Sequence, residues 1–141
     1  MNHALRLRIG ERKRREGDRR RRIGRDRHVL RLDLVAVDFE RDRLRPALEG
    51  AGLDFAEPAI FAWLGVVPYL TEPSVFALLR FVAGLPSSSI VFDYSEPLEN
   101  YPPERRARAA EMGSRTAAAG EPWLTHFDPK QLADRLLSLG F

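Results

Sequence analysis

From Val29 onward, strand-like runs alternate with helix-like segments, and this alternation limits the folds that the chain can adopt. Three short runs, at 29–37, 59–66 and 89–94, are rich in aliphatic, β-branched and aromatic residues, as strands are. A helix-like segment follows each run, and a second one follows the last. The predicted order is therefore β-α-β-α-β-α-α, an α/β fold with a mostly parallel sheet covered by helices.

Residues with strong preferences for helix ends mark two of these helices. Thr71 predicts the N-cap of a helix that Gly84 ends. Asp128 predicts the N-cap of the last helix, with Pro129 at its first position and Gln131 placed to complete a capping box. These residues give the most definite boundaries in the sequence.

The other elements have fewer boundary residues. Helices are expected at about 44–51 and 103–119, and Pro46 is compatible with the first of them only near its first turn. The run Ala59–Val66 is nearly all apolar, which predicts a strand buried on both faces.

Charge divides the chain into two parts, 1–28 and 29–141. Residues 1–28 hold eleven Arg and one Lys against four acidic residues, a net charge of +8, whereas the remainder carries −5. The basic segment shows no stable apolar period, so we expect it to be disordered. It could bind nucleic acid non-specifically through phosphate contacts. The alternative is a segment without an evolved role, such as the product of a shifted reading frame.

Several classes of function are disfavoured by what the sequence lacks. There is no cysteine, which excludes disulfides and thiolate chemistry. The three histidines are not spaced with acids as metal ligands are, so no metal site is expected. No apolar run is long enough for a membrane span, and no secretory signal is recognisable at the N-terminus. A cytoplasmic location is expected.

Candidate binding residues lie where the predicted strands end, because ligands of open parallel sheets bind beyond the carboxyl ends of the strands. The first strand ends at Asp38-Phe39, and the third ends at Asp93-Tyr94. An acid beside an aromatic ring suits a nucleoside, since the carboxylate can accept a hydrogen bond while the ring packs on the base. The alternative is that Asp38 caps the next turn and Phe39 belongs to the core.

The second strand contributes further candidates with equally open alternatives. Trp63 could line a pocket or belong to the core. Gly65 could permit a close backbone approach or simply end the strand. Tyr69 could hydrogen-bond a substrate or pack beside the start of the next helix.

Four blocks in this order resemble the bacterial methyltransferases related to leucine carboxyl methyltransferases. They are Val35–Asp42, Phe61–Glu72, Val91–Tyr94 and Gly120–Pro129. The resemblance spans about 29–141. It implies a partial Rossmann-like class I methyltransferase sheet, made of the family's third to fifth strands with their helices.

The resemblance also implies S-adenosyl-L-methionine as cofactor and an O-acceptor, a carboxylate or a hydroxyl, of a small molecule or a protein. Asp38 and Phe39 match the pair that contacts the adenine, with Trp63, Leu64 and Gly65 nearby. The eukaryotic enzymes are expected to have an acidic residue where Leu64 stands, which loosens the substrate assignment. We place Tyr69, Asp93 and Tyr94 on the acceptor side. No catalytic residue is identified.

Parts of the family pattern are not found in this sequence. A glycine-rich turn of the GxGxDTR type is missing, as is the following acid that holds the ribose. The family continues into two more strands where this chain ends. We therefore expect a truncated domain with impaired methyl transfer, a first strand that must pair elsewhere, and open edges that favour self-association. A non-catalytic fragment is the alternative.

Overall fold

The computed structural model describes residues 3–9 and 31–141. They form two compact units, which we describe one at a time. The first unit holds 3–9, 31–38 and 42–53, and the second holds Phe39–Arg41 and Asp54–Phe141. Of the segment 1–28, only His3–Ile9 is among the described residues, so the expectation for 10–28 stays a prediction.

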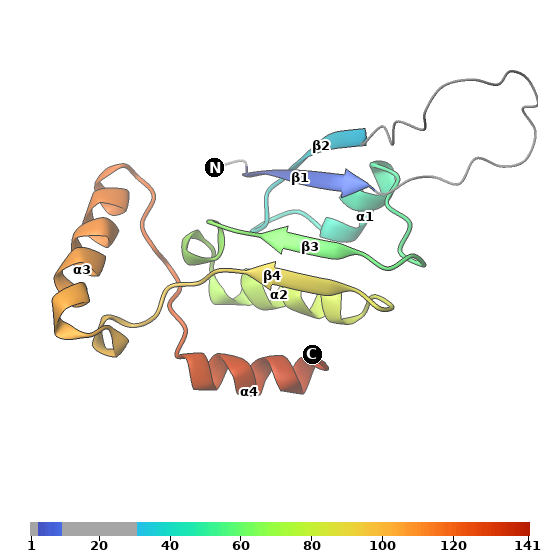
Figure 1. Ribbon diagram of the computed structural model, residues 1–141. Coiled ribbons are helices and arrows are strands. Elements are labelled where there is room, and N and C mark those ends of the chain that lie inside the picture. Colours follow the sequence, from blue (N-terminus) through green and yellow to red (C-terminus); the bar gives the residue numbers. More distant parts are fainter. Residues whose placement is uncertain (1–2, 10–30) are drawn as a thin grey trace, which may run out of the picture. The chain divides into compact units, whose positions relative to one another are not determined.

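The first unit is an antiparallel strand pair with one helix (Figure 1). Strand β1 (His3–Ile9) pairs with β2 (Arg31–Val37), in a register that places His3 opposite Val37. Helix α1 (Leu44–Gly50) follows, with Leu48 fully buried. The short helix expected after Asp38 is therefore present, with Pro46 in its first turn.

Strand β1 corrects the expectation of disorder for the start of the chain. Residues 5–9 read Leu-Arg-Leu-Arg-Ile, a strict two-residue alternation typical of a strand, although no stable period extends over 1–28 as a whole. Strand β2 was expected to lack its family neighbour and to pair elsewhere, and it pairs with β1. The backbone groups along this edge of β2 are thereby satisfied, which an unpaired strand would leave exposed.

The second unit is built on a parallel strand pair crossed over by a helix. Strands β3 (Ile60–Trp63) and β4 (Ser89–Phe92) pair in parallel, with Ile60 opposite Ser89. Helix α2 (Glu72–Ala83) connects them and lies against the sheet in Figure 1. A parallel pair requires such a crossover, so the alternation seen in the sequence is confirmed for this part of the chain. The described strands form two two-stranded sheets rather than one.

Helix α2 supplies more of the core of the second unit than any other helix or strand. Five of its side chains are buried: Val75, Phe76, Leu78, Leu79 and Val82. The ring of Phe81 packs edge-on against that of Phe61 in β3, at 6.3 Å between centroids. Helix α4 (Pro129–Leu139) adds the buried Leu132. Helix α3 (Pro103–Ala118) has no buried residue.

The expectation that Ala59–Val66 is buried on both faces is wrong. Ile60 is 83% exposed and Val91 is 58% exposed, whereas Trp63 is 3% exposed. The reason is that α2 covers only one face of the β3–β4 pair. An all-apolar strand sequence signals burial on both faces only when a second layer is present.

The ends of α4 are confirmed where the sequence placed them. The Asp128 carboxylate accepts hydrogen bonds from the backbone N–H groups of Lys130 and Gln131, each at 3.1 Å. The amide of Asn100 donates to the same carboxylate. These bonds hold the pKa of Asp128 below its ordinary value, the backbone N–H of Gln131 contributing most. Gly140 ends the helix with a φ of 98°.

Substituting Asp128 tests this cap. Because the pKa of Asp128 is lowered in the folded state, its stabilisation is present above the ordinary value of 3.8 and is lost as pH falls through the folded-state pKa. Asp128→Ala should lower the melting temperature at pH 7, and the difference from wild type should shrink on acidification. Asp128→Asn keeps a capping acceptor and should retain part of the stability. Equal melting temperatures for all three proteins at pH 7 would contradict the cap.

Candidate functional site

The carboxyl ends of β3 and β4 are joined by a hydrogen bond between a backbone amide and a carboxylate. Gly65 N donates to Asp93 Oδ1 at 2.7 Å. Gly65 has a φ of +71°, and a Cβ added there would meet nothing within 4 Å. The glycine is therefore required by backbone conformation rather than by crowding. Asp93, predicted on the acceptor side, has one carboxylate oxygen engaged in holding this turn.

An aromatic pair lies beside this turn. The rings of Phe39 and Trp63 are 5.7 Å apart between centroids, with an interplanar angle of 57°. Phe39 is half-buried and Trp63 is buried. The Trp63 indole N–H is also buried, and no described residue accepts a hydrogen bond from it. Such an unpaired donor is costly, and unpaired donors of this kind often mark places where a ligand or water completes the structure.

The other predicted cofactor residues fall in different surroundings. Leu64 is 59% exposed, so its side chain offers an apolar surface next to Gly65. Asp38 belongs to the first unit and is not among the groups that the second unit brings together. Its backbone N–H donates to the Asp42 carboxylate at 2.7 Å. The turn after β2 is thus closed by Asp42, which the sequence did not single out.

Tyr94 follows β4 and lies between two other rings. Its ring centroid is 6.3 Å from that of Phe92 and 6.4 Å from that of Phe127. Desolvation, with smaller contributions from the carboxylates of Glu96 and Asp128, raises the pKa of the Tyr94 hydroxyl. The hydroxyl therefore stays protonated at neutral pH and can donate a hydrogen bond.

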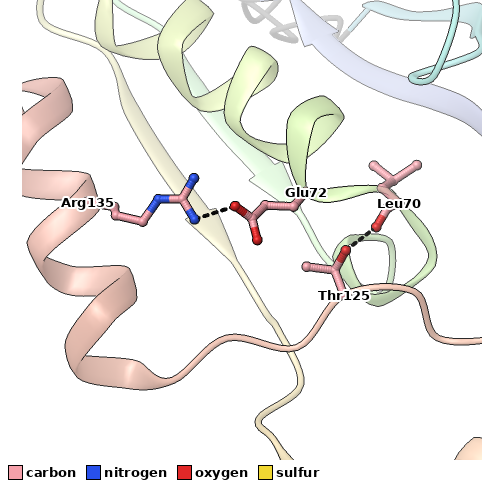
Figure 2. Close-up of polar contacts among 4 residues, drawn as sticks. All are labelled: Leu70, Glu72, Thr125 and Arg135. Carbon is pink, nitrogen blue, oxygen red and sulfur yellow. Dashed lines mark hydrogen bonds and ion pairs between the residues drawn. The ribbon is translucent and has the colours of Figure 1, made fainter.

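Tyr69 ends the short 3-10 helix Val67–Tyr69 after β3 and is half-buried. A segment before α4 folds back onto this loop. The backbone N–H of Leu124 donates to the carbonyl of Pro68 at 2.7 Å, and the Thr125 hydroxyl donates to the carbonyl of Leu70 (Figure 2). The loops that follow β3 and precede α4 therefore meet.

Figure 2 also shows the ion pair that ties α4 to α2. The Arg135 guanidinium contacts the Glu72 carboxylate at 2.6 Å. The same guanidinium lies 3.4 Å from the centre of the Phe76 ring. Both groups of the ion pair are about half exposed, so we give the pair a modest role in stability and a larger one in fixing the helix pairing.

Sequence reasoning missed the polar group that links these loops to β4. The Ser95 hydroxyl, in a residue that is 5% exposed, lies 3.0 Å from the Thr125 carbonyl and 3.0 Å from His126 Nδ1. A carbonyl can only accept, so both contacts are hydrogen bonds at once only if Nδ1 carries a proton. In the neutral ring, Nε2 is then the acceptor. A lone Ser after a strand gives no signal from which this could be predicted.

Comparison with known families identifies the relatives of this chain. The sequence model of the leucine carboxyl methyltransferase family matches residues 11–83, more than half of the chain. The chain belongs to the leucine carboxyl methyltransferase family. The matched range includes Asp38, Phe39, the stretch 63–65 and Tyr69, whereas Asp93 and Tyr94 lie beyond it.

Comparisons with the curated proteins and with the solved structures gave no match. The described residues contain no cluster of His, Cys, Asp or Glu suited to a metal ion. No helix among residues 3–9 and 31–141 has the length and apolar character that crossing a membrane requires.

Replacing Gly65 with alanine tests the turn at the end of β3. A side chain at a φ of +71° costs about 1–2 kcal/mol, so Gly65→Ala should lower the free energy of unfolding by that amount. Gly84→Ala is the matched control, because Gly84 has a φ of −79° and a Cβ there makes only ordinary contacts. Urea unfolding measures both. Equal effects of the two substitutions would contradict the account of Gly65.

Proposed function

We propose that this chain is a member of the S-adenosylmethionine-dependent methyltransferases whose second unit binds the adenine end of the cofactor. One observation carries the proposal: Phe39 lies against Trp63 beside the carboxyl end of β3, within the stretch that the family model matches. Ligands of open parallel sheets bind at this end of the strands. We further propose that β2, β3 and β4 correspond to the third, fourth and fifth strands of a class I methyltransferase sheet.

The residues present fit an adenine. The Phe39 ring can pack on the base, and the nitrogens of adenine are acceptors of the kind that the buried Trp63 indole N–H lacks. Leu64 supplies apolar surface. The turn at Gly65 would let the backbone approach the adenine closely. The match of Asp38 to the family's adenine contact stays a prediction, because Asp38 belongs to the first unit. When bound, the cofactor supplies an electrophilic methyl group.

On the acceptor side, we assign binding to Tyr94 and Tyr69, and to Asp93 the holding of the Gly65 turn. The protonated Tyr94 hydroxyl can donate a hydrogen bond to a carboxylate or hydroxyl oxygen that takes the methyl group. The proposed acceptor class is therefore an oxygen nucleophile. Methylation of a carboxylate needs no general base, because a carboxylate has no proton to lose, whereas a hydroxyl acceptor would release its proton to water.

The affinity of this chain for the whole cofactor should be low. The sequence has no glycine-rich turn of the kind that contacts the methionine part, and no corresponding acid for the ribose. Each unmade hydrogen bond to a charged group forfeits about 1.5–3 kcal/mol. We therefore propose impaired methyl transfer by the chain alone.

Calorimetric titration with S-adenosylhomocysteine tests the proposal. Weak binding is expected, with a dissociation constant on the order of 100 μM or higher, since only part of the ligand is held. Adenosine should bind almost as well as the full ligand. An absence of binding at millimolar ligand would overturn the proposed function, and a dissociation constant of about 1 μM would overturn the claim of low affinity.

Phe39→Ala identifies the site in the same titration. Stacking of a base on an aromatic ring contributes about 1–3 kcal/mol, so the affinity should fall by roughly fivefold to 150-fold. Phe141→Ala is the matched control, because Phe141 is exposed at the end of the chain and should leave the affinity unchanged. Equal affinities of the two variants would place the ligand elsewhere.

A further inference from the structure

Glu40 connects the turn after β2 to the start of α2. Its Oε1 accepts a hydrogen bond from the backbone N–H of Thr71 at 2.7 Å. Its Oε2 accepts from the hydroxyls of Thr71 and Ser74, each at 2.8 Å. Thr71 immediately precedes α2 and Ser74 lies in its first turn, and Thr71 is 31 residues from Glu40 in the sequence.

This carboxylate accepts the hydrogen bond from the N-cap N–H that the N3 side chain accepts in a capping box. Thr71 occupies the N-cap position, but its side chain makes no capping hydrogen bond to the helix. Its hydroxyl donates to Glu40 instead. The start of a helix presents unpaired N–H groups and a partial positive charge, both of which favour an anion. Two effects therefore stabilise the Glu40 carboxylate at this position: hydrogen bonds from three donors, and attraction to the partial positive charge at the start of the helix.

The position of Glu40 in the chain gives this contact a second consequence. Residues Phe39–Arg41 group with the second unit, whereas Asp38 and Asp42 on either side group with the first. Three hydrogen bonds at Glu40 thus fix the backbone of a three-residue segment whose first member is Phe39. The Phe39 ring lies 5.7 Å from Trp63.

We propose that Glu40 is a positioning residue that holds Phe39 against Trp63, and so shapes the adenine-binding surface. This inference rests on the proposed function. The effect of Glu40 on the ligand passes through Phe39. Without the carboxylate, Phe39 is released from its place beside Trp63, and affinity for the adenine is lost even though α2 remains folded.

Glu72→Ala is the control for a merely structural role. Glu72 is the first residue of α2, carries the same charge and pairs with Arg135 rather than with the Phe39 segment. Glu40→Ala and Glu72→Ala each remove one carboxylate from the same helix end. Only the first should alter the Phe39–Trp63 pair. Glu40→Gln keeps the length and one carbonyl oxygen and should recover part of the contact.

The first measurement needs no ligand. In a Trp123→Phe background, Trp63 is the remaining tryptophan. Acrylamide quenching of its fluorescence reports how well it is covered. Glu40→Ala should raise the quenching constant about as much as Phe39→Ala does, Glu40→Gln should raise it less, and Glu72→Ala should leave it unchanged. Equal quenching in Glu40→Ala and Glu72→Ala would overturn the proposal.

The second measurement is a double-mutant cycle on the affinity for S-adenosylhomocysteine. Glu40→Ala should weaken binding about threefold to tenfold when Phe39 is present, and should add almost nothing to Phe39→Ala, as expected for coupled residues. Additive losses would overturn the proposal. If the wild-type protein binds no ligand, the proposed function fails, and the quenching comparison decides by itself whether Glu40 holds Phe39. Circular dichroism checks that each variant remains folded.

Discussion

The parallel pairing of β3 with β4 is the interaction on which the second unit depends. Two parallel strands cannot be joined by a tight turn, so the chain must cross over between them, and α2 does so. The same pairing places both carboxyl ends at one edge of the sheet. Trp63 and Phe92 are opposite one another in the register, which brings Gly65 within reach of Asp93.

Around this edge, polar contacts between segments distant in sequence give the loops their places. Glu40 holds the Phe39 segment at the start of α2, and Ser95 and Thr125 hold the segment before α4 against the loop after β3. Several of these contacts use backbone carbonyls or amides as one partner. A site that is built in this way needs few particular side chains, which is consistent with the small number of titratable groups that gather there.

The sequence predicted what local chemistry determines. The ends of α2 follow from Thr71 and Gly84, and the start of α4 follows from Asp128 and Pro129, because capping preferences are properties of a few neighbouring residues. The candidate positions at the ends of β3 and β4 follow from the periodicity in the same way. Phe39 and Trp63 were both singled out, although nothing in the sequence showed that their rings are in contact.

What the sequence could not provide depends on long-range partners. The exposure of Ile60 follows from how many layers cover the sheet, and the strand His3–Ile9 depends on pairing with β2. The role of Glu40 depends on donors that lie more than 30 residues away. A single sequence does not show which of many acidic residues will meet such donors, whereas the family match covers the stretch without assigning that contact.

The central claim is that an adenosyl group binds beside Phe39 and Trp63. Titration of the ¹⁵N-labelled protein with S-adenosylhomocysteine, followed by ¹H–¹⁵N correlation spectra, tests this most directly. The account predicts that the indole N–H signal of Trp63 and the amide signals of Phe39 and Gly65 shift with ligand, while the indole signal of Trp123 stays in place. Shifts confined to Trp123 and α3, or no shifts at millimolar ligand, would contradict it.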